Sequence, residues 1–425
     1  MSIEQKQFVI FADIHNPYCS KMKEKILSLL GFPPPASLKK TYGPWKDGTS
    51  IVENTLVVDG RNVSNATALK AVYSQLQEGV KSIKANGKVL IYSVEPELLD
   101  TSTGLNASVH HSTYQRALEG ISRSLAKELG GRGTTVNLLK LPPNMDLKNY
   151  ETVQAFFTSG RSAFITGQAV TTNDATTSGR ELSEKICVVT GGAGGIGSAT
   201  VKRLATEGAT VIIADMPQME ERAKSLLSNA GKVSFLGADL TDEAARKSLL
   251  DSIKEQHGRI DVLVNNAGIT RDKTLKNMPE HYWDNLIAIN LTAVINLTED
   301  ALAMGLIPEG GRIISTSSIS GIAGNFGQTN YTATKAALIG YSAAKSKELK
   351  AKGITINAIA PGYIETDMVK TMPLMTRIFA ERLTSLAQAG KPEDIAEAIA
   401  FLAHPGAESI NGQVLRVCGG SFLGA

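Results

Sequence analysis

Four polar side chains in the second half of the chain are of the types that hold or move a proton beside an oxygen atom. Tyr331 and Lys335 are four residues apart, so on a helix they share one face. A phenol alone has a pKa of about 10, and a nearby ammonium group favours the phenolate, so this pair predicts proton exchange near neutral pH. Ser318, on the loop after a predicted strand at 312–317, can donate a hydrogen bond to a substrate oxygen as charge develops. Asn290, predicted on the helix after the fourth strand, can hold a water that relays protons to Lys335.

A glycine-rich turn comes earlier in the same half. Residues 186–190 (ICVVT) are typical of a buried parallel strand, and the turn after them has the spacing G-x-x-x-G-x-G, at Gly191, Gly195 and Gly197. Glycine permits a tight turn and lets the backbone approach a pyrophosphate, and the predicted helix that begins near Ile196 points its amides at the phosphates. The spacing differs by one residue from the common dinucleotide fingerprint, so the loop alone can also be a plain Gly-rich turn. Together, the loop and the polar residues predict a site that binds a dinucleotide and moves a hydride to or from a carbonyl carbon.

Polar residues also follow three other predicted strands. Asp215 ends the strand ATVIIAD, where a carboxylate can accept hydrogen bonds from the adenosine ribose and would repel a 2′-phosphate. Met216 and Pro217 follow it, with no basic residue directly after, so the sequence favours NAD(H) over NADP(H). Strand ends that face one crevice are where such folds bind ligands. The remaining strand-end residues predicted to contact the cofactor are Asp239, Leu240, Asn266, Ala267 and Gly268.

Six stretches of the second half match the sequence pattern of a known family. They are TGGAGGIG (190–197), NNAGITRD (265–272), SSISG (317–321), GQTNYTATKAAL (327–338), NAIAPGYIETDM (357–368) and GQVLRVCGG (412–420). With them, residues 184–425 resemble a short-chain dehydrogenase/reductase, and within that superfamily the 3-oxoacyl-acyl-carrier-protein reductases. The resemblance implies that the four polar residues form a catalytic tetrad, and that Tyr331 and Lys335 also contact the cofactor. It further implies nicotinamide contacts from the turn Pro361, Gly362 and Ile364, and reversible reduction of 3-oxoacyl thioesters to 3-hydroxyacyl thioesters.

The chain departs from that family in two respects. Its members typically use NADPH, whereas Asp215 favours NADH. The family also binds acyl-carrier protein through two basic residues, and their positions here hold Lys352 and Glu309, the second with reversed charge. A coenzyme A thioester is therefore as plausible a substrate as a carrier-protein thioester. Two other functions stay open: a dehydrogenase of another alcohol or carbonyl compound, and a non-catalytic assembly subunit of a fatty-acid synthesis complex.

Length and composition narrow the class of protein. A chain of 425 residues predicts two domains, and its net charge of +3 gives no indication of nucleic-acid binding. Three widely spaced cysteines favour reduced thiols in the cytoplasm. An 18-residue apolar run and a signal-peptide pattern are both absent, so no membrane association is expected. His110 and His111 have no cysteine or acidic residue at ligand spacing, so no metal site is predicted.

The predicted elements alternate between strand and helix throughout the chain. The pattern indicates an α/β fold with two doubly wound, Rossmann-like domains. In the first half, strands are expected at 8–13, 55–60, 88–94 and 134–141, and helices at 64–84 and 112–130. Residues 1–167 are interpreted as a degenerate, flavodoxin-like domain without cofactor, the polar residues 168–183 as a linker, and 184–425 as the catalytic domain.

The first half also repeats part of the second. GISRSLAKELGGRGTTVN (120–137) matches GYSAAKSKELKAKGITIN (340–357), and 87–93 resembles 311–317. The repeat places His111 at the position of Tyr331 and Gln115 at that of Lys335, so this copy is predicted to be catalytically silent. We expect it to act as an internal partner subunit, so that a homodimer would mimic the tetramer of the reductase family. Residues 365–391 can form either a mobile lid over an acyl tail or an ordinary helix pair.

Overall fold

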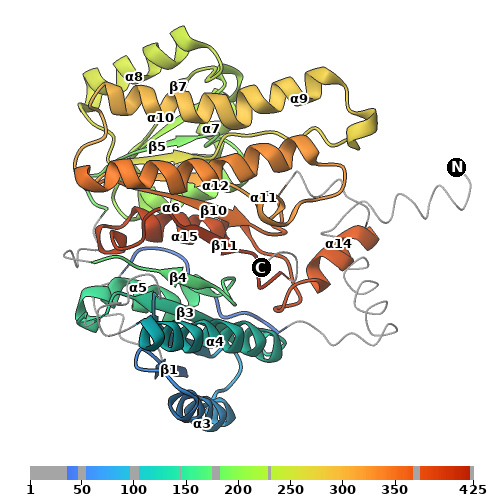
Figure 1. The fold of residues 1–425 in the computed structure, drawn as a ribbon. Coiled ribbons are helices and arrows are strands. Elements are labelled where there is room, and N and C mark those ends of the chain that lie inside the picture. Colours follow the sequence, from blue (N-terminus) through green and yellow to red (C-terminus); the bar gives the residue numbers. More distant parts are fainter. Residues whose placement is uncertain are drawn as a thin grey trace, which may run out of the picture.

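The computed structural model describes residues 36–45, 54–95, 105–143, 145–174, 182–227, 231–366 and 374–421, and places them in two parallel β-sheets (Figure 1). The α/β class predicted from the sequence is confirmed. The predicted strand at 8–13 and Cys19 lie outside the described residues, as does the middle of the predicted linker.

The C-terminal half contains a seven-stranded sheet with the order β11-β10-β9-β8-β5-β6-β7. Its strands, in chain order, are β5 (Ile186–Thr190), β6 (Thr210–Asp215), β7 (Val233–Gly237), β8 (Val262–Asn265), β9 (Arg312–Thr316), β10 (Thr355–Pro361) and β11 (Val414–Val417). The strand order reverses between β5 and β8. In such sheets ligands bind at the carboxyl ends of the strands on either side of this reversal.

Helices cover both faces of this sheet because successive strand residues point to opposite faces. Val188 packs with α8 (Glu243–His257), α10 (Ala293–Ala303) and the end of α12 (Thr329–Leu349). Val189, the next residue, packs with α6 (Gly195–Thr206), α7 (Glu220–Leu227) and α15 (Pro392–Ala403). The described residues of this half also form α9 (Glu280–Ile287), α11 (Ser320–Ala323) and α14 (Leu374–Arg382).

The N-terminal half has a four-stranded sheet with the order β1-β2-β3-β4. Its strands are β1 (Thr55–Asp59), β2 (Lys88–Val94), β3 (Thr135–Leu141) and β4 (Ala169–Thr171). The described residues of this half also form the helices α3 (Ala66–Ser82), α4 (Leu105–Gly130) and α5 (Glu151–Thr158). The predicted linker is wrong at its start, because β4 pairs with β3 as the last strand of this sheet. The strand β4 has only three residues and lies in a Thr-rich stretch, so its sequence shows no recognisable strand pattern.

The two sheets share one strand register, which supports the internal repeat. Lys88 of β2 pairs with Thr135 of β3, and their counterparts Arg312 of β9 and Thr355 of β10 are paired in the same way. Side-chain contacts within these strands repeat as well: the Asn137 amide donates to the Ile165 carbonyl at 3.0 Å, and the Asn357 amide donates to the Ile410 carbonyl at 2.8 Å. The order β1 to β4 therefore reproduces the order β8 to β11.

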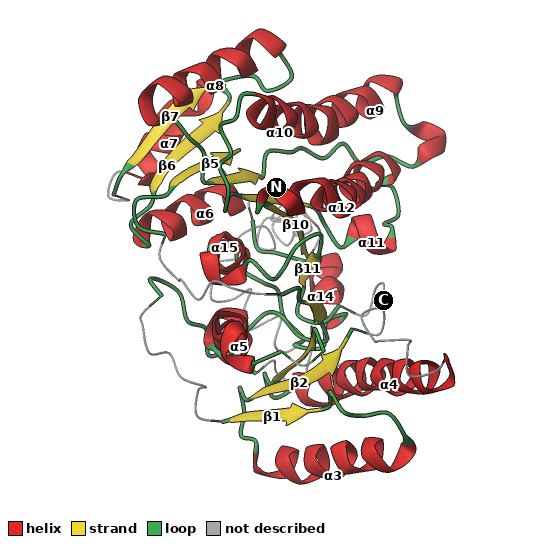
Figure 2. Ribbon diagram, turned by 60° about the vertical axis from the view of Figure 1, so that its left-hand side comes forward, coloured by secondary structure: helices red, strands yellow, loops and turns green. Residues whose placement is uncertain are grey.

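A single hydrophobic core joins the two halves. Helices α5, α6 and α15 lie between the two sheets, where α5 and its counterpart α15 face each other (Figure 2). Two backbone hydrogen bonds cross the junction in opposite directions, from Asn173 N to Ser409 O at 2.7 Å and from Gly419 N to Phe164 O at 2.9 Å. The halves thus meet through equivalent surfaces, as two subunits meet across a two-fold axis.

One helical stretch among the described residues, Glu280–Ala303, is long and apolar enough by composition to cross a membrane. It comprises α9, a π-helical turn and α10, and it packs against α12 inside the catalytic fold. A helix of a globular core passes the same test, so this stretch is weak evidence for a membrane span. The cytoplasmic location stays a prediction.

Candidate active site

The glycine turn after β5 is shaped by close backbone contacts. Gly191 has a φ of 63°, and a Cβ added there would lie 2.9 Å from the Cα of Ala267. A Cβ on Gly197 would lie only 2.1 Å from the Gly191 carbonyl oxygen, so α6 can start this close to the turn only with glycine there. Gly194 is the N-cap of α6, and within the described residues no side chain caps it. The first amides of α6 are therefore open toward the pocket.

Two carboxylates lie at the far end of this crevice, after β6 and β7. The Asp215 carboxylate accepts hydrogen bonds from Ala193 N at 3.1 Å and from Met216 N at 2.8 Å. Asp239 accepts from the backbone and hydroxyl of Thr241 at 2.9 and 2.7 Å. Both carboxylates line one pocket together with Leu240, as expected for the adenosine end of a dinucleotide site. An ionised carboxylate has about four acceptor positions, so each keeps some for a ligand.

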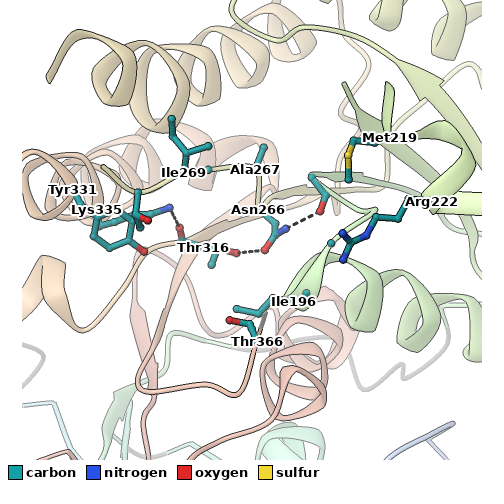
Figure 3. Close-up of a pocket in the computed structure, with 15 residues that line it drawn as sticks. Ile196, Met219, Arg222, Asn266, Ala267, Ile269, Thr316, Tyr331, Lys335 and Thr366 are labelled. Carbon is teal, nitrogen blue, oxygen red and sulfur yellow. Dashed lines mark hydrogen bonds between the residues drawn. The ribbon is translucent and has the colours of Figure 1, made fainter. Parts of the chain in front are cut away.

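Asn266 fixes the strand ends at the centre of the crevice. Its side-chain amide donates to Thr190 O at 3.2 Å and to Gly191 O at 3.3 Å, and its oxygen accepts from the Thr316 hydroxyl at 3.4 Å (Figure 3). The Thr190 hydroxyl in turn accepts from the backbone of Asn266 and Ala267, both at 3.0 Å. The ends of β5, β8 and β9 are thereby held in one rigid arrangement.

Tyr331 and Lys335 lie on one face of α12, as their spacing predicts, and both line the crevice (Figure 3). The Lys335 ammonium donates to the Thr316 carbonyl at 2.7 Å and lies 5.7 Å from the centroid of the Tyr331 ring. Burial lowers the pKa of Lys335 to about 8, because taking the ammonium out of water disfavours the charged form.

The predicted lowering of the Tyr331 pKa is absent in the protein alone. Burial raises the pKa of Tyr331, and a hydrogen bond with Ser318 lowers it only in part. The physical reason is that the Lys335 ammonium points at the Thr316 carbonyl, so desolvation of the phenol prevails. Ser318 does lie beside Tyr331, where its hydroxyl oxygen also accepts from Ser320 N at 3.1 Å.

Asn290 is fully buried in a π-helical turn, residues 288–292, that joins α9 to α10. Single π-helical turns of this kind are frequent at functional sites. Its side chain exchanges two hydrogen bonds of 2.9 Å with the backbone of Ile269. A Cβ added to Gly268 would lie 3.2 Å from Asn290 Oδ1 and 3.4 Å from Lys335 Nζ, so all three groups meet at one point. The Asn290 side chain is therefore bonded to the backbone of Ile269, and its role in holding a water stays a prediction.

A second pocket of about 460 Å³ adjoins the crevice at Tyr331. Tyr331 is common to both pockets, and Ser318 and Gln328 line the second one. The turn Pro361, Gly362 and Ile364 lines this second pocket, and Ile364 forms a β-bridge with Gly390. Tyr331 and Lys335 therefore line the crevice, Tyr331 and Ser318 line the second pocket, and Asn290 lies buried beside Gly268 and Lys335.

Three residues that no sequence motif indicates also contribute to the crevice. Thr316 accepts the Lys335 hydrogen bond, and Met219 and Arg222 line the crevice beside the glycine turn (Figure 3). Arg222 comes from α7, seven residues after Asp215, so a search of the residue directly after the strand misses it. Its side chain brings positive charge to the same pocket as Gly194 and Gly195.

The predicted lid falls partly outside the described residues, since 367–373 are not described. Its later part forms α14 and a turn whose Leu383 and Thr384 line the second pocket. Among the described residues, no group of three His, Cys, Asp or Glu side chains is placed to hold a metal ion. The absence of a resident metal stays a prediction.

Three independent features of the crevice fit a bound dinucleotide. These are glycines that a Cβ would block, an uncapped start of α6, and carboxylates at the opposite end. The first two admit phosphates, and the third offers acceptors to sugar hydroxyls.

Comparison with known proteins gives the class. Residues 185–376 match the family model for short chain dehydrogenases. The chain belongs to this family, and it is an oxidoreductase whose catalytic half uses a nicotinamide cofactor.

Similar proteins indicate which type of oxidoreductase the chain resembles. The chain is 43% identical over 246 residues to 3-oxoacyl-acyl-carrier-protein reductase FabG of Thermotoga maritima, a match that covers 57% of this chain and 99% of that protein. FabG of Escherichia coli is 39% identical over 240 residues, which are 56% of this chain and 98% of the relative. Nodulation protein G of Azospirillum brasilense is 39% identical over 246 residues, with 56% and 98% covered. All three matches cover little more than half of this chain.

Proposed function

We propose that the C-terminal half reduces 3-oxoacyl thioesters to 3-hydroxyacyl thioesters with NADH. The observation that carries the proposal is the position of Tyr331, whose side chain lines both the dinucleotide crevice and the adjoining pocket. A carbonyl group in the second pocket can therefore lie against the phenol and the cofactor at once. The names of the FabG relatives support the thioester substrate.

Reduced nicotinamide supplies the hydride, which goes to the carbonyl carbon at position 3. Tyr331 gives its proton to the oxygen of that carbonyl as the charge develops, and Ser318 donates a hydrogen bond to the same oxygen. The carbonyl becomes a hydroxyl group, and the loss of the proton leaves Tyr331 as a phenolate. Lys335, with its ammonium at 5.7 Å from the ring centroid, stabilises that phenolate until solvent returns a proton.

The other residues hold this arrangement in place. Asn290 fixes Ile269 next to Lys335, and Thr316 orients the ammonium. Asp215 and Asp239 are proposed to bind the adenosine end, and the glycine turn with Asn266, Ala267 and Gly268 to bind the centre of the cofactor. The turn Pro361, Gly362 and Ile364 is proposed to contact the nicotinamide end.

The carrier of the acyl group is proposed to be coenzyme A or acyl-carrier protein. Glu309 and Lys352 both precede the strands β9 and β10, whereas Ser318 and Pro361 lie at the other ends of these strands. The two positions that the family uses for the carrier thus lie at the amino ends of these strands, whereas this chain's own pocket lies at their carboxyl ends. Charge reversal at Glu309 weakens any attraction for an acidic carrier there.

The N-terminal half is proposed to be a non-catalytic copy that serves as an internal partner. Gln115, at the position of Lys335, uses its amide fully: the nitrogen donates to Gly60 O at 3.0 Å and Val63 O at 2.9 Å, and the oxygen accepts from Ser93 Oγ at 2.9 Å. The crossing hydrogen bonds between the halves support a homodimer that mimics a tetramer of related units. Sedimentation that shows a stable tetramer of chains would contradict it.

The test is the rate of NADH oxidation with acetoacetyl-coenzyme A and with 3-oxoacyl-acyl-carrier protein. We expect turnover in the native protein, and a loss of about 10²- to 10⁴-fold in kcat for Tyr331→Phe. Tyr341→Phe is the matched control, because Tyr341 lies on the same helix but bonds to Glu299 at 2.7 Å. Near-normal turnover in Tyr331→Phe would refute the proton donor, and no turnover of either thioester would refute the substrate class.

A further inference from the structure

A wall of the second pocket rests on the N-terminal half. We define the back wall as residues 384–390 and 419–421. Its two segments are joined by hydrogen bonds from Ser385 N to Gly420 O at 3.0 Å and from Leu386 N to Gly419 O at 3.1 Å. Thr384 and Ser421, at the front of the back wall, line the second pocket.

The back wall also continues into the loop proposed to contact nicotinamide. Gly390 N donates to Tyr363 O at 2.9 Å, and Gly390 O accepts from Glu365 N at 2.9 Å. Ile364 lies between these two bonds and is 4% exposed. A displacement of the back wall is therefore transmitted directly to Ile364.

Phe164 of the N-terminal half is wedged into this wall and is 1% exposed. A Cβ on Gly390 would lie 2.5 Å from the Phe164 ring and 2.6 Å from Ile364 Cδ1, and a Cβ on Gly419 would lie 2.7 Å from the same ring. The Phe164 ring thus packs between Gly390 and Gly419, and Gly390 lies between the ring and the Ile364 side chain. A side chain at either glycine would collide with the ring.

Gly130, the last residue of α4, is the second point of support. A Cβ at this position would lie 2.2 Å from Ser385 O and 2.7 Å from the carbon of that carbonyl. Gly130 lies within a helix and has no positive φ, so its backbone does not require glycine. A side chain here would collide with the Ser385 carbonyl, so contact with the back wall is a physical reason for glycine at this helix end.

We propose that the N-terminal half is a positioning element for catalysis, whose Phe164 and Gly130 set the back wall of the substrate pocket and the loop at Ile364. The inference rests on the proposed function only for the identity of the substrate. Relatives such as FabG of Thermotoga maritima are matched over 99% of their length by the C-terminal half, so their own chains have no counterpart of these supports. The silent copy thereby has a role in the reaction that requires no cofactor of its own.

The test compares Gly130→Ala with Gly120→Ala in the full chain. Both substitutions add one methyl group to α4, but a Cβ at Gly120 has no heavy atom within 4 Å. We expect Gly130→Ala to raise KM for acetoacetyl-coenzyme A about tenfold and to raise the dissociation constant of NADH by a smaller factor, because Ile364 is only one of the proposed cofactor contacts. Hydrogen exchange at residues 384–390 is expected to be about tenfold faster than in the native protein. Gly120→Ala is expected to match the native protein in every measurement.

A second pair of variants tests the proposal if small shifts around Ser385 accommodate the methyl group added by Gly130→Ala. Phe164→Ala removes the wedge, whereas Leu118→Ala removes a fully buried side chain from the N-terminal core away from the back wall. Faster exchange at 384–390 in Phe164→Ala alone supports the proposal. Native exchange and native KM in both Gly130→Ala and Phe164→Ala would overturn it. Hydrogen exchange needs no substrate, so a native protein that fails to reduce 3-oxoacyl thioesters refutes the proposed function and leaves this test intact.

Discussion

Phe156 and Phe401 occupy equivalent positions in the two halves of the chain, and their rings stack on each other. The shift that takes Ala169 of β4 to Val414 of β11 also takes Phe156 to Phe401, and both follow from the shared register of the sheets. The ring centroids are 3.9 Å apart and the planes differ by 1°. The pair therefore marks the local two-fold axis on which the halves meet.

This stack gives the first prediction. Aromatic pairs prefer offset or edge-to-face geometry, so burial of apolar area holds this nearly parallel pair more than ring electrostatics does. We expect Phe156→Ala to lower the free energy of unfolding by about 3–5 kcal/mol, and Phe156→Leu by less than about 1.5 kcal/mol. Urea denaturation measures both. Phe326→Ala, at a side chain that is 90% exposed, is the control and should change little.

A buried ion-pair network next to the stack gives the second prediction. Glu397 of α15 is 1% exposed and binds Arg161 of the N-terminal half at 2.8 Å and Arg203 of α6 at 2.6 Å. It also accepts from Gly43 N at 3.0 Å. The carboxylate therefore joins three segments that are distant in sequence.

Removal of this carboxylate leaves two arginines without their shared partner in a buried place. We expect Glu397→Ala to cost about 3–5 kcal/mol of the free energy of unfolding, because the buried Arg161 loses the carboxylate with which it is paired, while Arg203 keeps Glu207 at 2.6 Å. Glu220→Ala removes one partner of the exposed pair with Lys224 and should change the urea midpoint little. Equal midpoints in urea for the two variants would contradict the role given to Glu397.

Much of the catalytic site follows from sequence because its signals are local. The spacing of Tyr331 and Lys335, the glycine turn and the residues at strand ends all predict positions that the structure brings to one crevice. The repeat is also visible in sequence, since the matched segments continue from helix through turn into strand.

What sequence does not predict depends on contacts between distant segments. The direction of the Lys335 ammonium depends on the Thr316 carbonyl, which no side-chain pattern encodes. Gly130 looks like an ordinary helix end in sequence, and only the approach of Ser385 explains it. The strand β4 is three residues long and is defined by its partner β3.

The low pKa of Lys335 gives the third prediction. The ammonium is charged below about pH 8 in the protein alone. We expect the negatively charged cofactor to favour this charged form. The affinity for NADH should therefore be constant below pH 8 and weaken as pH rises above it, by up to tenfold per unit. Fluorescence titration with NADH measures this. Lys335→Met should bind weakly with no such dependence, and a flat profile in the native protein would refute the linkage.

The preference for NADH gives the last prediction, which concerns Asp215. Its carboxylate is held by two backbone amides at the end of β6, with acceptor positions left for ribose hydroxyls. A hydrogen bond to a charged group contributes about 1.5–3 kcal/mol, so Asp215→Ala should lower the NADH to NADPH ratio of kcat/KM by about 10- to 100-fold. Relief of repulsion toward a 2′-phosphate acts in the same direction. Asp239→Ala is the matched control, because its carboxylate is bound to Thr241 and is expected to affect both coenzymes equally. If Asp215→Ala instead weakens both coenzymes equally, the selectivity resides elsewhere in the crevice, with Arg222 the first residue to substitute.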